Sequence, residues 1–319
     1  MLALSRAARL LATLLLIGGC ASPGPRQFDA QLPERVELAG VPFFPQQRYQ
    51  CGPAALSTML VQRGVATSPE QLLPQVYLPG RQGSLKVELV AAARQHDLLV
   101  YPLEPRLEAL LAQVAAGHPV LVMQNLGLDW WPQWHFAVVV GYDLSREELL
   151  LRSATEKRLL TPFRLFERSW ARAERWAVLT LPPERLPAQP QLTTWLQAAS
   201  DLEQTGRGAA AQRAYRTAEH HWPQAALPSF AMGNARYADG DRAAAEAALR
   251  ESVRRQGDFA VGWFNLSEVL NEAGCVAQAR AARHCARQLA PQDARLSAPL
   301  VPLAGSQARC AALPSCPRP

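Results

Sequence analysis

The sequence predicts an α+β domain followed by an all-α domain of helical repeats. Residues 36–181 mix apolar stretches of strand and helix periodicity, which is typical of an α+β fold. Residues 182–191 then hold four prolines, and because proline removes a backbone donor we interpret them as a linker. Beyond this linker, alanine and arginine recur at helical spacing. A chain of 319 residues, 49% of them hydrophobic, is long enough for two such domains.

A repeat runs through the second half of the chain, where Gly206, Gly240 and Gly274 are each 34 residues apart. The small residues that follow these glycines at fixed intervals are Ala211, Ala245, Ala279, Ala218, Ser252 and Ala286. The pattern resembles tetratricopeptide repeats, in which glycine forms the turn between two closely paired helices. The resemblance implies three repeats over residues 192–293.

Four cysteines lie near the end of the chain. Cys275 and Cys285 fall on one predicted helix, where ten residues separate them by about 15 Å, too far for a disulfide. We therefore expect each of them to pair with one of Cys310 and Cys316. Residues 294–319 would then form a disulfide-stapled cap over the last repeat, which repeat arrays need.

The N-terminus predicts an exported lipoprotein. Arg6 and Arg9 precede an apolar stretch, residues 10–17, that is too short for a permanent membrane span. Two glycines and Cys20 follow, and this order resembles the bacterial lipobox. The resemblance implies that residues 1–19 are a signal peptide and that Cys20 carries lipid.

Lipid on Cys20 would hold the protein at a membrane through a linker, residues 20–35. The residue after Cys20 is Ala21 rather than the Asp that resembles an inner-membrane retention signal. We therefore expect an outer-membrane location, lipid-anchored and facing the periplasm. That compartment is oxidising, which agrees with disulfides among the four C-terminal cysteines.

The charge pattern does not indicate nucleic-acid binding. The formal net charge is +6, but the arginines are scattered rather than clustered. The sequence contains neither a paired-cysteine zinc motif nor a glycine-rich phosphate loop, so we expect no metal and no cofactor.

Cys51 stands alone at the front of a predicted helix. A helix N-terminus carries free backbone donors and partial positive charge, both of which favour a thiolate. Gly52 would let a substrate approach the backbone, and Pro53 suits a first turn. This is a suitable position for a nucleophile.

A nucleophilic cysteine needs a base, and the first domain offers three histidines. His96 ends a predicted helix and His118 lies in a turn, so we interpret both as structural. His135 opens a buried strand and can hold an imidazole beside a cleft. Gln46, or its neighbour Gln47, can place an amide beside the developing oxyanion, with the Cys51 N–H as a second donor.

Three segments carry a family resemblance: PFFPQQRYQCGPAAL, AAGHPVLVMQN and HFAVVVGYD. Together they resemble family thirty-nine of the cysteine peptidases, which includes the bacteriocin-processing, double-glycine leader peptidases. The resemblance implies a papain-like fold over residues 36–181, with Cys51 as nucleophile, His135 as base and Gln46 as oxyanion donor. With the lipobox and the repeats, the chain resembles a proteobacterial group of lipoproteins.

One residue departs from the family pattern, which usually has an Asp on the strand after the histidine. Pairing the strand of His135 with residues 148–157 as a hairpin places Ser153 there. Asp143 is eight residues along from His135, about 26 Å on a straight strand, and so is out of reach. The orienting group is therefore Ser153, Glu156, Asn125 or a backbone carbonyl.

Two further features flank these residues. Trp130, Trp131 and Trp134 precede His135 and form either a packed lid or a wall of the substrate cleft. Gly80 and Gly83 bracket a turn before a helix, which we interpret as structural.

The sequence thus predicts a lipid-anchored periplasmic cysteine peptidase that cleaves peptide bonds and recruits a protein partner through its repeats. Two alternatives remain open. The first is a non-catalytic adaptor that binds peptides, which the missing Asp favours. The second is an acyltransferase that uses the same thioester chemistry.

Overall fold

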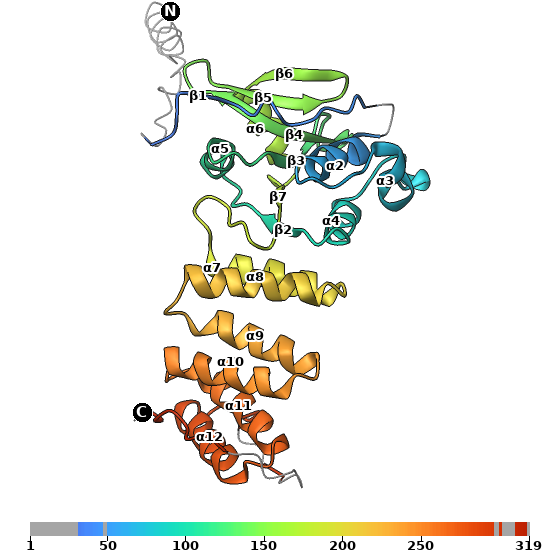
Figure 1. Cartoon of the computed structure of the whole chain (residues 1–319). Coiled ribbons are helices and arrows are strands. Elements are labelled where there is room, and N and C mark those ends of the chain that lie inside the picture. The colour runs from blue at the N-terminus through green and yellow to red at the C-terminus, as the bar shows by residue number, and fades with distance from the viewer. Residues whose placement is uncertain (1–30, 47–49, 297–299, 302–309, 318–319) are drawn as a thin grey trace, which may run out of the picture. The chain divides into compact units, whose positions relative to one another are not determined.

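The computed structural model describes residues 31–46, 50–296, 300–301 and 310–317. The expected signal peptide, Cys20 and Gln47 lie outside the described residues. Within the described part, an antiparallel sheet with helices is followed by a region of six helices (Figure 1). This confirms the predicted order of an α+β domain and an all-α domain.

The described strands form one antiparallel sheet in the order β2-β7-β3-β4-β5-β6, with β1 paired to β4. The strands are β1 (Arg35–Glu37), β2 (Leu99–Pro102), β3 (Val120–Asn125), β4 (Trp134–Asp143), β5 (Glu148–Ser153), β6 (Glu156–Pro162) and β7 (Ala177–Leu181). Strands β3 and β7 are buried along their whole length, and β4 is buried except at its ends. Such burial on both faces explains their continuous apolar sequences.

Helices cover both faces of this sheet. They are α2 (Cys51–Val61), α3 (Pro69–Val76), the short 3-10 helix η1 (Pro79–Arg81), α4 (Lys86–Arg94), α5 (Leu107–Ala115) and α6 (Phe163–Ala171). Met59 of α2 joins a buried cluster with Met123 and Phe136 of the sheet. Neighbouring strand residues point to opposite faces, so α6 packs on the other face, where Gln124 of β3 donates a hydrogen bond to Ser169.

Strand β4 changes partners along its length, and this opens the sheet at one end. It pairs with β3 from Trp134 to Val139, but with β5 only from Val138 onward. The first residues of β4 therefore keep one backbone edge free of strand pairing. This free edge is where the N-terminus of α2 approaches the sheet.

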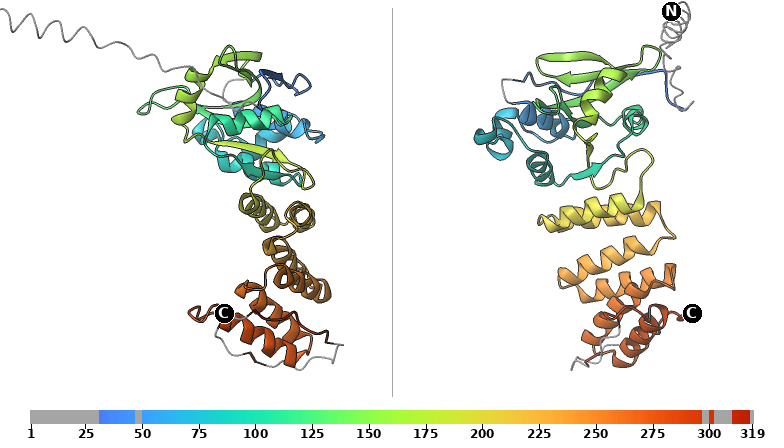
Figure 2. Two further views of the ribbon diagram at one scale, coloured as in Figure 1. Left: turned by 90° about the vertical axis from the view of Figure 1, so that its left-hand side faces the viewer. Right: turned by 180° about the vertical axis from the view of Figure 1, so that it is seen from behind.

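The six helices of the second region pack as successive antiparallel pairs (Figure 2). They are α7 (Leu192–Gln204), α8 (Gly208–His221), α9 (Ala226–Ala238), α10 (Arg242–Arg255), α11 (Ala260–Glu272) and α12 (Val276–Leu289). Gly206, Gly240 and Gly274 follow the first helix of each pair with φ of 80°, 83° and 77°. Only glycine adopts this left-handed conformation readily, which explains why the repeat period is marked by glycine.

The small residues of the repeat lie where the paired helices meet. Ala211, Ala245, Ala279, Ala218, Ser252 and Ala286 are all fully buried. Trp195 and Trp263 fill the first and third repeats and are also buried, while Ser229 takes the equivalent position in the second. Small residues at these positions let the helices approach closely, as the repeat pattern predicts.

Two disulfides join the last repeat to the C-terminal tail. Cys275 pairs with Cys310, and Cys285 pairs with Cys316. Cys275 caps α12 and Cys285 lies within it, so the two cannot reach each other, as the helical spacing predicts. The described tail residue Leu313 packs with the tail cysteines against the buried cluster of α10, α11 and α12.

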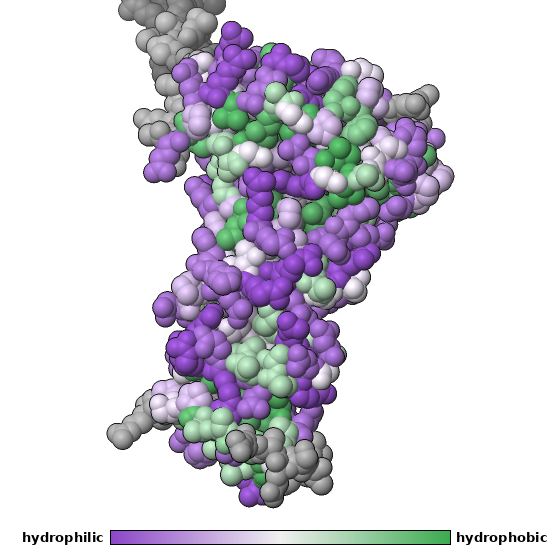
Figure 3. Space-filling view, in the orientation of Figure 1, coloured by the Kyte–Doolittle hydropathy of each residue, from purple (hydrophilic) through white to green (hydrophobic). Residues whose placement is uncertain are grey.

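Among the described residues, no helix has the length and hydropathy needed to cross a bilayer. On the face shown in Figure 3, hydrophobic residues are interspersed among hydrophilic ones.

Candidate active site

Cys51 is the first residue of α2 and the free cysteine of the described residues. No side chain caps this helix, and the first helical hydrogen bond runs from the N–H of Ala54 to the carbonyl of Gln50. Pro53 has no N–H, so the unsatisfied donors of the first turn are those of Cys51 and Gly52. Both lie beside the thiol, where they lower its pKa.

Gly52 has a different role from the one its position suggests. It is buried, and a Cβ added there would lie 2.3 Å from Ser84 Oγ and 2.5 Å from Ser84 Cβ. The close neighbour of this glycine is therefore the side chain of Ser84 rather than a substrate. The packing holds the turn before α4 directly against the residue that follows the thiol.

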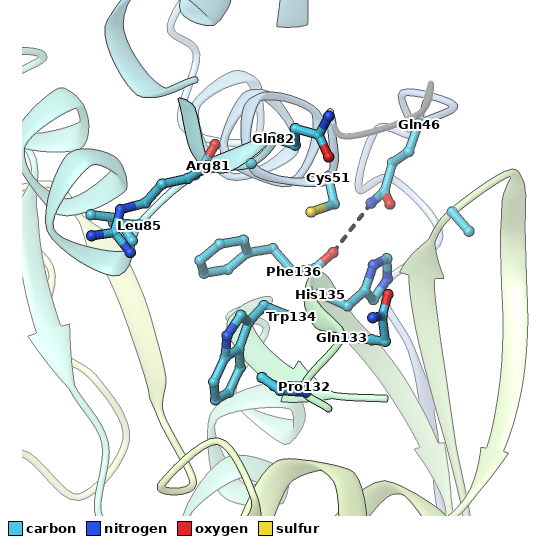
Figure 4. Close-up of a pocket in the computed structure, with 13 residues that line it drawn as sticks. Gln46, Cys51, Arg81, Gln82, Leu85, Pro132, Gln133, Trp134, His135 and Phe136 are labelled. Carbon is cyan, nitrogen blue, oxygen red and sulfur yellow. Dashed lines mark hydrogen bonds between the residues drawn. The ribbon is translucent and has the colours of Figure 1, made fainter. Parts of the chain in front are cut away.

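The free edge of β4 faces the start of α2 (Figure 4). A hydrogen bond between the backbone of Phe136 and Cys51 lowers the pKa of the thiol. The carbonyl of the same residue accepts a hydrogen bond of 3.3 Å from Gln46 Nε2. The N–H of Gln46 in turn donates to the carbonyl of Ala154, at 2.8 Å, which fixes the segment that carries the amide. Gln46 and Cys51 are thus held at one strand edge.

His135 lies at the mouth of β4 and contacts Ser153, the last residue of β5. Its Nε2 is 2.8 Å from Ser153 Oγ. In the tautomer whose Nε2–H donates to the hydroxyl, Nδ1 keeps the lone pair that can accept a proton. The β4–β5 pairing that brings these residues together is the hairpin expected from the sequence.

The other candidates for the orienting group lie elsewhere. Asn125 Oδ1 accepts hydrogen bonds from the N–H groups of Gly127 and Gln133, so this side chain shapes the loop before His135. The side chain of Asp143 accepts from Ser145 at the far end of β4. Glu156 is exposed and makes no hydrogen bond to His135.

Burial keeps both reactive groups neutral in this geometry. Desolvation raises the pKa of the Cys51 thiol above its ordinary value, and the surrounding backbone hydrogen bonds offset this rise only in part. Desolvation also lowers the pKa of His135 to about 4. The expected resting thiolate is therefore not favoured, because the loss of water outweighs the field of the helix terminus.

Cys51, His135 and Gln46 line a single cavity of about 560 Å³. No hydrogen bond joins the thiol to the imidazole. Side chains rotate between staggered wells, and hydrogen bonds of catalytic pairs often tighten only when substrate binds. Ser153 stands behind the imidazole and outside the cavity lining, as an orienting group should.

The three tryptophans divide between two environments. Trp134 lines the cavity beside His135, with 53% of its surface exposed. Trp130 and Trp131 stack edge to face outside the cavity and are 78% and 66% exposed. The interpretation as a cleft wall therefore applies to Trp134 alone, and none of the three is a packed core residue.

The opposite wall of the cavity is the turn at Gly80 and Gly83, so this turn lines the site as well as preceding a helix. The lining residues of this turn are Arg81, Gln82, Gly83, Ser84 and Leu85. The signal for it was the pair Gly80 and Gly83 ahead of a helix, which marks a turn but does not say what the turn faces. Only its packing against Gly52 places it beside Cys51.

The remaining histidines of the domain lie outside the cavity. His118 is 3% exposed, and its Nδ1 is 3.4 Å from the Arg63 guanidinium. Burial lowers the pKa of His118 to about 4. The part of the chain that the structure describes has no group of three His, Cys, Asp or Glu residues that could hold a metal ion.

We expect Ser153→Asp to raise the pKa of His135, because a carboxylate at Nε2 stabilises imidazolium where a hydroxyl does not. An imidazole with a pKa of about 4 stays a base down to about pH 4. The acid limb of kcat/KM should therefore move to higher pH in the variant. A stronger base should also raise the rate near pH 7 about tenfold.

The measurement is the pH profile of the peptide hydrolysis that the sequence predicts, for the wild type, Ser153→Asp and Ser153→Ala. The alanine variant removes the hydroxyl without adding charge and serves as the control. An acid limb that stays in place in Ser153→Asp would show that residue 153 does not act on the imidazole.

The solved structures that are similar to parts of this chain include the following three. A C39-like peptidase from Bacillus anthracis is 19% identical with a TM-score of 0.40, over 47% of this chain and 98% of its own. A variant of the Thermobaculum terrenum O-GlcNAc transferase is 24% identical with a TM-score of 0.31, over 33% of this chain and 20% of its own. MamA is 18% identical with a TM-score of 0.31, over 33% of this chain and 62% of its own. The chain therefore spans a fifth of the transferase and less than two thirds of MamA.

A comparison with curated proteins finds no match. Residues 38–178, which hold the cavity and the side chains around it, match the model of the Peptidase_C39 like family.

Proposed function

We propose that the sheet domain is a cysteine peptidase with Cys51 as nucleophile and His135 as general base. The observation that carries this proposal is that one cavity brings together Cys51, His135 and Gln46. Ser153 is hydrogen-bonded to the imidazole nitrogen of His135, on the side away from the cavity. The family match over residues 38–178 supports the same chemistry.

The resting groups are neutral, so the proposed attack is coupled to proton transfer. Nδ1 of His135 takes the thiol proton as the sulfur of Cys51 attacks the substrate carbonyl. The imidazolium then gives this proton to the leaving amine, and the C–N bond breaks to leave a thioester. Water, deprotonated by the same imidazole, attacks the thioester carbonyl and releases the acid and the free thiol.

The developing oxyanion needs donors at the same place. The amide of Gln46 already donates to a carbonyl at the free edge of β4, so its N–H group points into the site. In the proposed mechanism this amide and the backbone N–H of Cys51 donate to the substrate oxygen. Donors placed in advance cost little reorganisation in the transition state.

The wider proposal concerns location and partners. We infer that lipid on Cys20 anchors the chain at the outer membrane, facing the periplasm, and that the helical repeats recruit a protein partner. The two disulfides between the last repeat and the tail support an oxidising compartment. Peptide or protein is the proposed substrate, and scattered arginines give no reason to propose nucleic acid.

Two other functions use the same residues. A neutral thiol and a hydroxyl in place of the usual carboxylate favour an adaptor that binds peptides without cleaving them. An acyltransferase would form the same thioester and pass the acyl group to an amine or hydroxyl instead of water.

The test is a mass-spectrometric cleavage profile of a synthetic peptide library, with the wild type and Cys51→Ala side by side. The peptidase proposal expects new termini with the wild type only. Binding by both proteins without cleavage would identify the adaptor. Products extended by an added amine, rather than hydrolysed, would identify the acyltransferase.

A further inference from the structure

The cavity around Cys51 carries an uncompensated positive charge. Of the residues that line it, Arg81 is the one that is charged at neutral pH, since His135 is neutral and no carboxylate is present. Arg81 is exposed and, among the described residues, forms no ion pair. Other arginines of the domain do form ion pairs, for example Arg106 with Glu104. An unpaired guanidinium facing a cleft is available to a ligand.

The backbone that carries Arg81 is held in place. The N–H of Leu78 donates to the carbonyl of Gly83 at 2.8 Å, and the N–H of Arg81 donates to the carbonyl of Leu78 at 3.0 Å. These bonds close the turn upon itself. The side chain of Ser84 then packs against the position of Gly52, next to the nucleophile. The root of the Arg81 side chain is therefore fixed relative to Cys51.

The position of His135 decides which part of a substrate meets Arg81. The leaving amine must take its proton from His135, so it lies on the imidazole side of the thiol. The acyl part of the substrate then extends the other way. In Figure 4 the labelled side chains on that side of Cys51 include Arg81, Leu85, Trp134 and the ring of Phe136, and His135 and Gln46 lie on the opposite side.

We propose that Arg81 selects an acidic side chain on the acyl side of the scissile bond. This inference rests on the proposed peptidase function and names its substrate class. Trp134 and Leu85 offer apolar surface for the methylene groups of a glutamate, while the guanidinium can bind the carboxylate through two parallel hydrogen bonds. A lysine at the same position would meet a like charge, which disfavours binding.

The first experiment measures binding without catalysis. Cys51→Ala is titrated with positional libraries of fluorophore-labelled tetrapeptides, in which one position is fixed as Glu, Gln or Lys, and fluorescence anisotropy is recorded. At one position Glu should bind about fivefold more tightly than Gln, as a solvent-accessible ion pair allows, and Lys should bind most weakly. Higher salt should reduce this preference.

The second arm removes the charge. Cys51→Ala/Arg81→Gln should bind the Glu and Gln libraries equally, and Cys51→Ala/Arg81→Glu should prefer Lys. Arg216, exposed on α8 and away from the cavity, provides the matched control, and Cys51→Ala/Arg216→Gln should keep the preference for Glu. Equal binding of the three libraries to Cys51→Ala, or a preference that survives Arg81→Gln, would overturn the proposal.

Cleavage by the wild type is measured separately, with coumarin-amide versions of the same libraries. A preference for Glu that depends on Arg81 in the binding assay, together with no cleavage, would refute the peptidase but keep the acidic subsite. Cleavage without a preference for Glu in either assay would refute the subsite and keep the peptidase.

Discussion

His135→Ala is expected to lower kcat/KM for peptide hydrolysis about a thousandfold. The thiol of Cys51 has a raised pKa, so it is protonated at pH 7 and cannot attack without a base. His135 is the only titratable side chain besides Cys51 and Arg81 among the residues that line the cavity. General-base catalysis contributes about 10² to 10⁴ in rate, and the expected thousandfold loss lies in the middle of that range.

This variant also predicts a change in pH dependence. The wild type should keep its activity down to about pH 4, where His135 becomes protonated. Without the imidazole, activity should instead rise with pH until the thiol ionises, because hydroxide then supplies the thiolate. Residual activity of His135→Ala at high pH would therefore support the mechanism.

The matched control is His284→Ala, since His284 is exposed on α12 and is not among the residues that line the cavity. Both variants should keep the wild-type circular dichroism spectrum. If His135→Ala cleaved peptides at the wild-type rate near pH 7, the imidazole would not be the base.

Gln46→Ala is expected to lower kcat about a hundredfold and to change KM little. Removal of one oxyanion donor typically costs 10² to 10³ in kcat, because the donor is stronger toward the transition state than toward the ground-state carbonyl. The amide of Gln46 is already directed to this strand edge, where it donates to the carbonyl of Phe136.

Gln46→Glu is the sharper variant, because it keeps the shape of the side chain and removes the N–H donors. It should lose at least as much kcat as Gln46→Ala, since a carboxylate would repel the oxyanion. Thermal unfolding of both variants shows how much stability is lost with the hydrogen bond to Phe136, and so separates this effect from the loss of catalysis. A glutamate variant that is folded and fully active would exclude an oxyanion role for this residue.

Much of the fold follows from local patterns in the sequence. The glycines of the repeat mark helix ends because φ near +80° is open to them, and the alanines between them mark helix contacts because larger side chains would not fit. Helical rise keeps Cys275 and Cys285 apart and so predicts that each pairs with a tail cysteine, while the structure decides that Cys275 pairs with Cys310 and Cys285 with Cys316.

The site was predicted only in part. Cys51 and His135 became candidates because Cys51 begins a predicted helix, His135 opens a buried strand, and both fall in segments that resemble the peptidase family. The sequence does not show which residue packs against Gly52, or that the turn at Arg81 lines the cavity. Both depend on how α4 packs beside α2. Sequence distance carries no information about such contacts.

The order of the elements, the repeat and the candidate nucleophile were determined by the sequence itself, since they depend on spacing along the chain. The tertiary structure decided which hydroxyl meets the imidazole, because strand register sets the contact between His135 and Ser153. It also decided that both reactive groups rest uncharged. The pKa of a side chain depends on how much water the surrounding fold removes, and that burial is a property of the packed molecule.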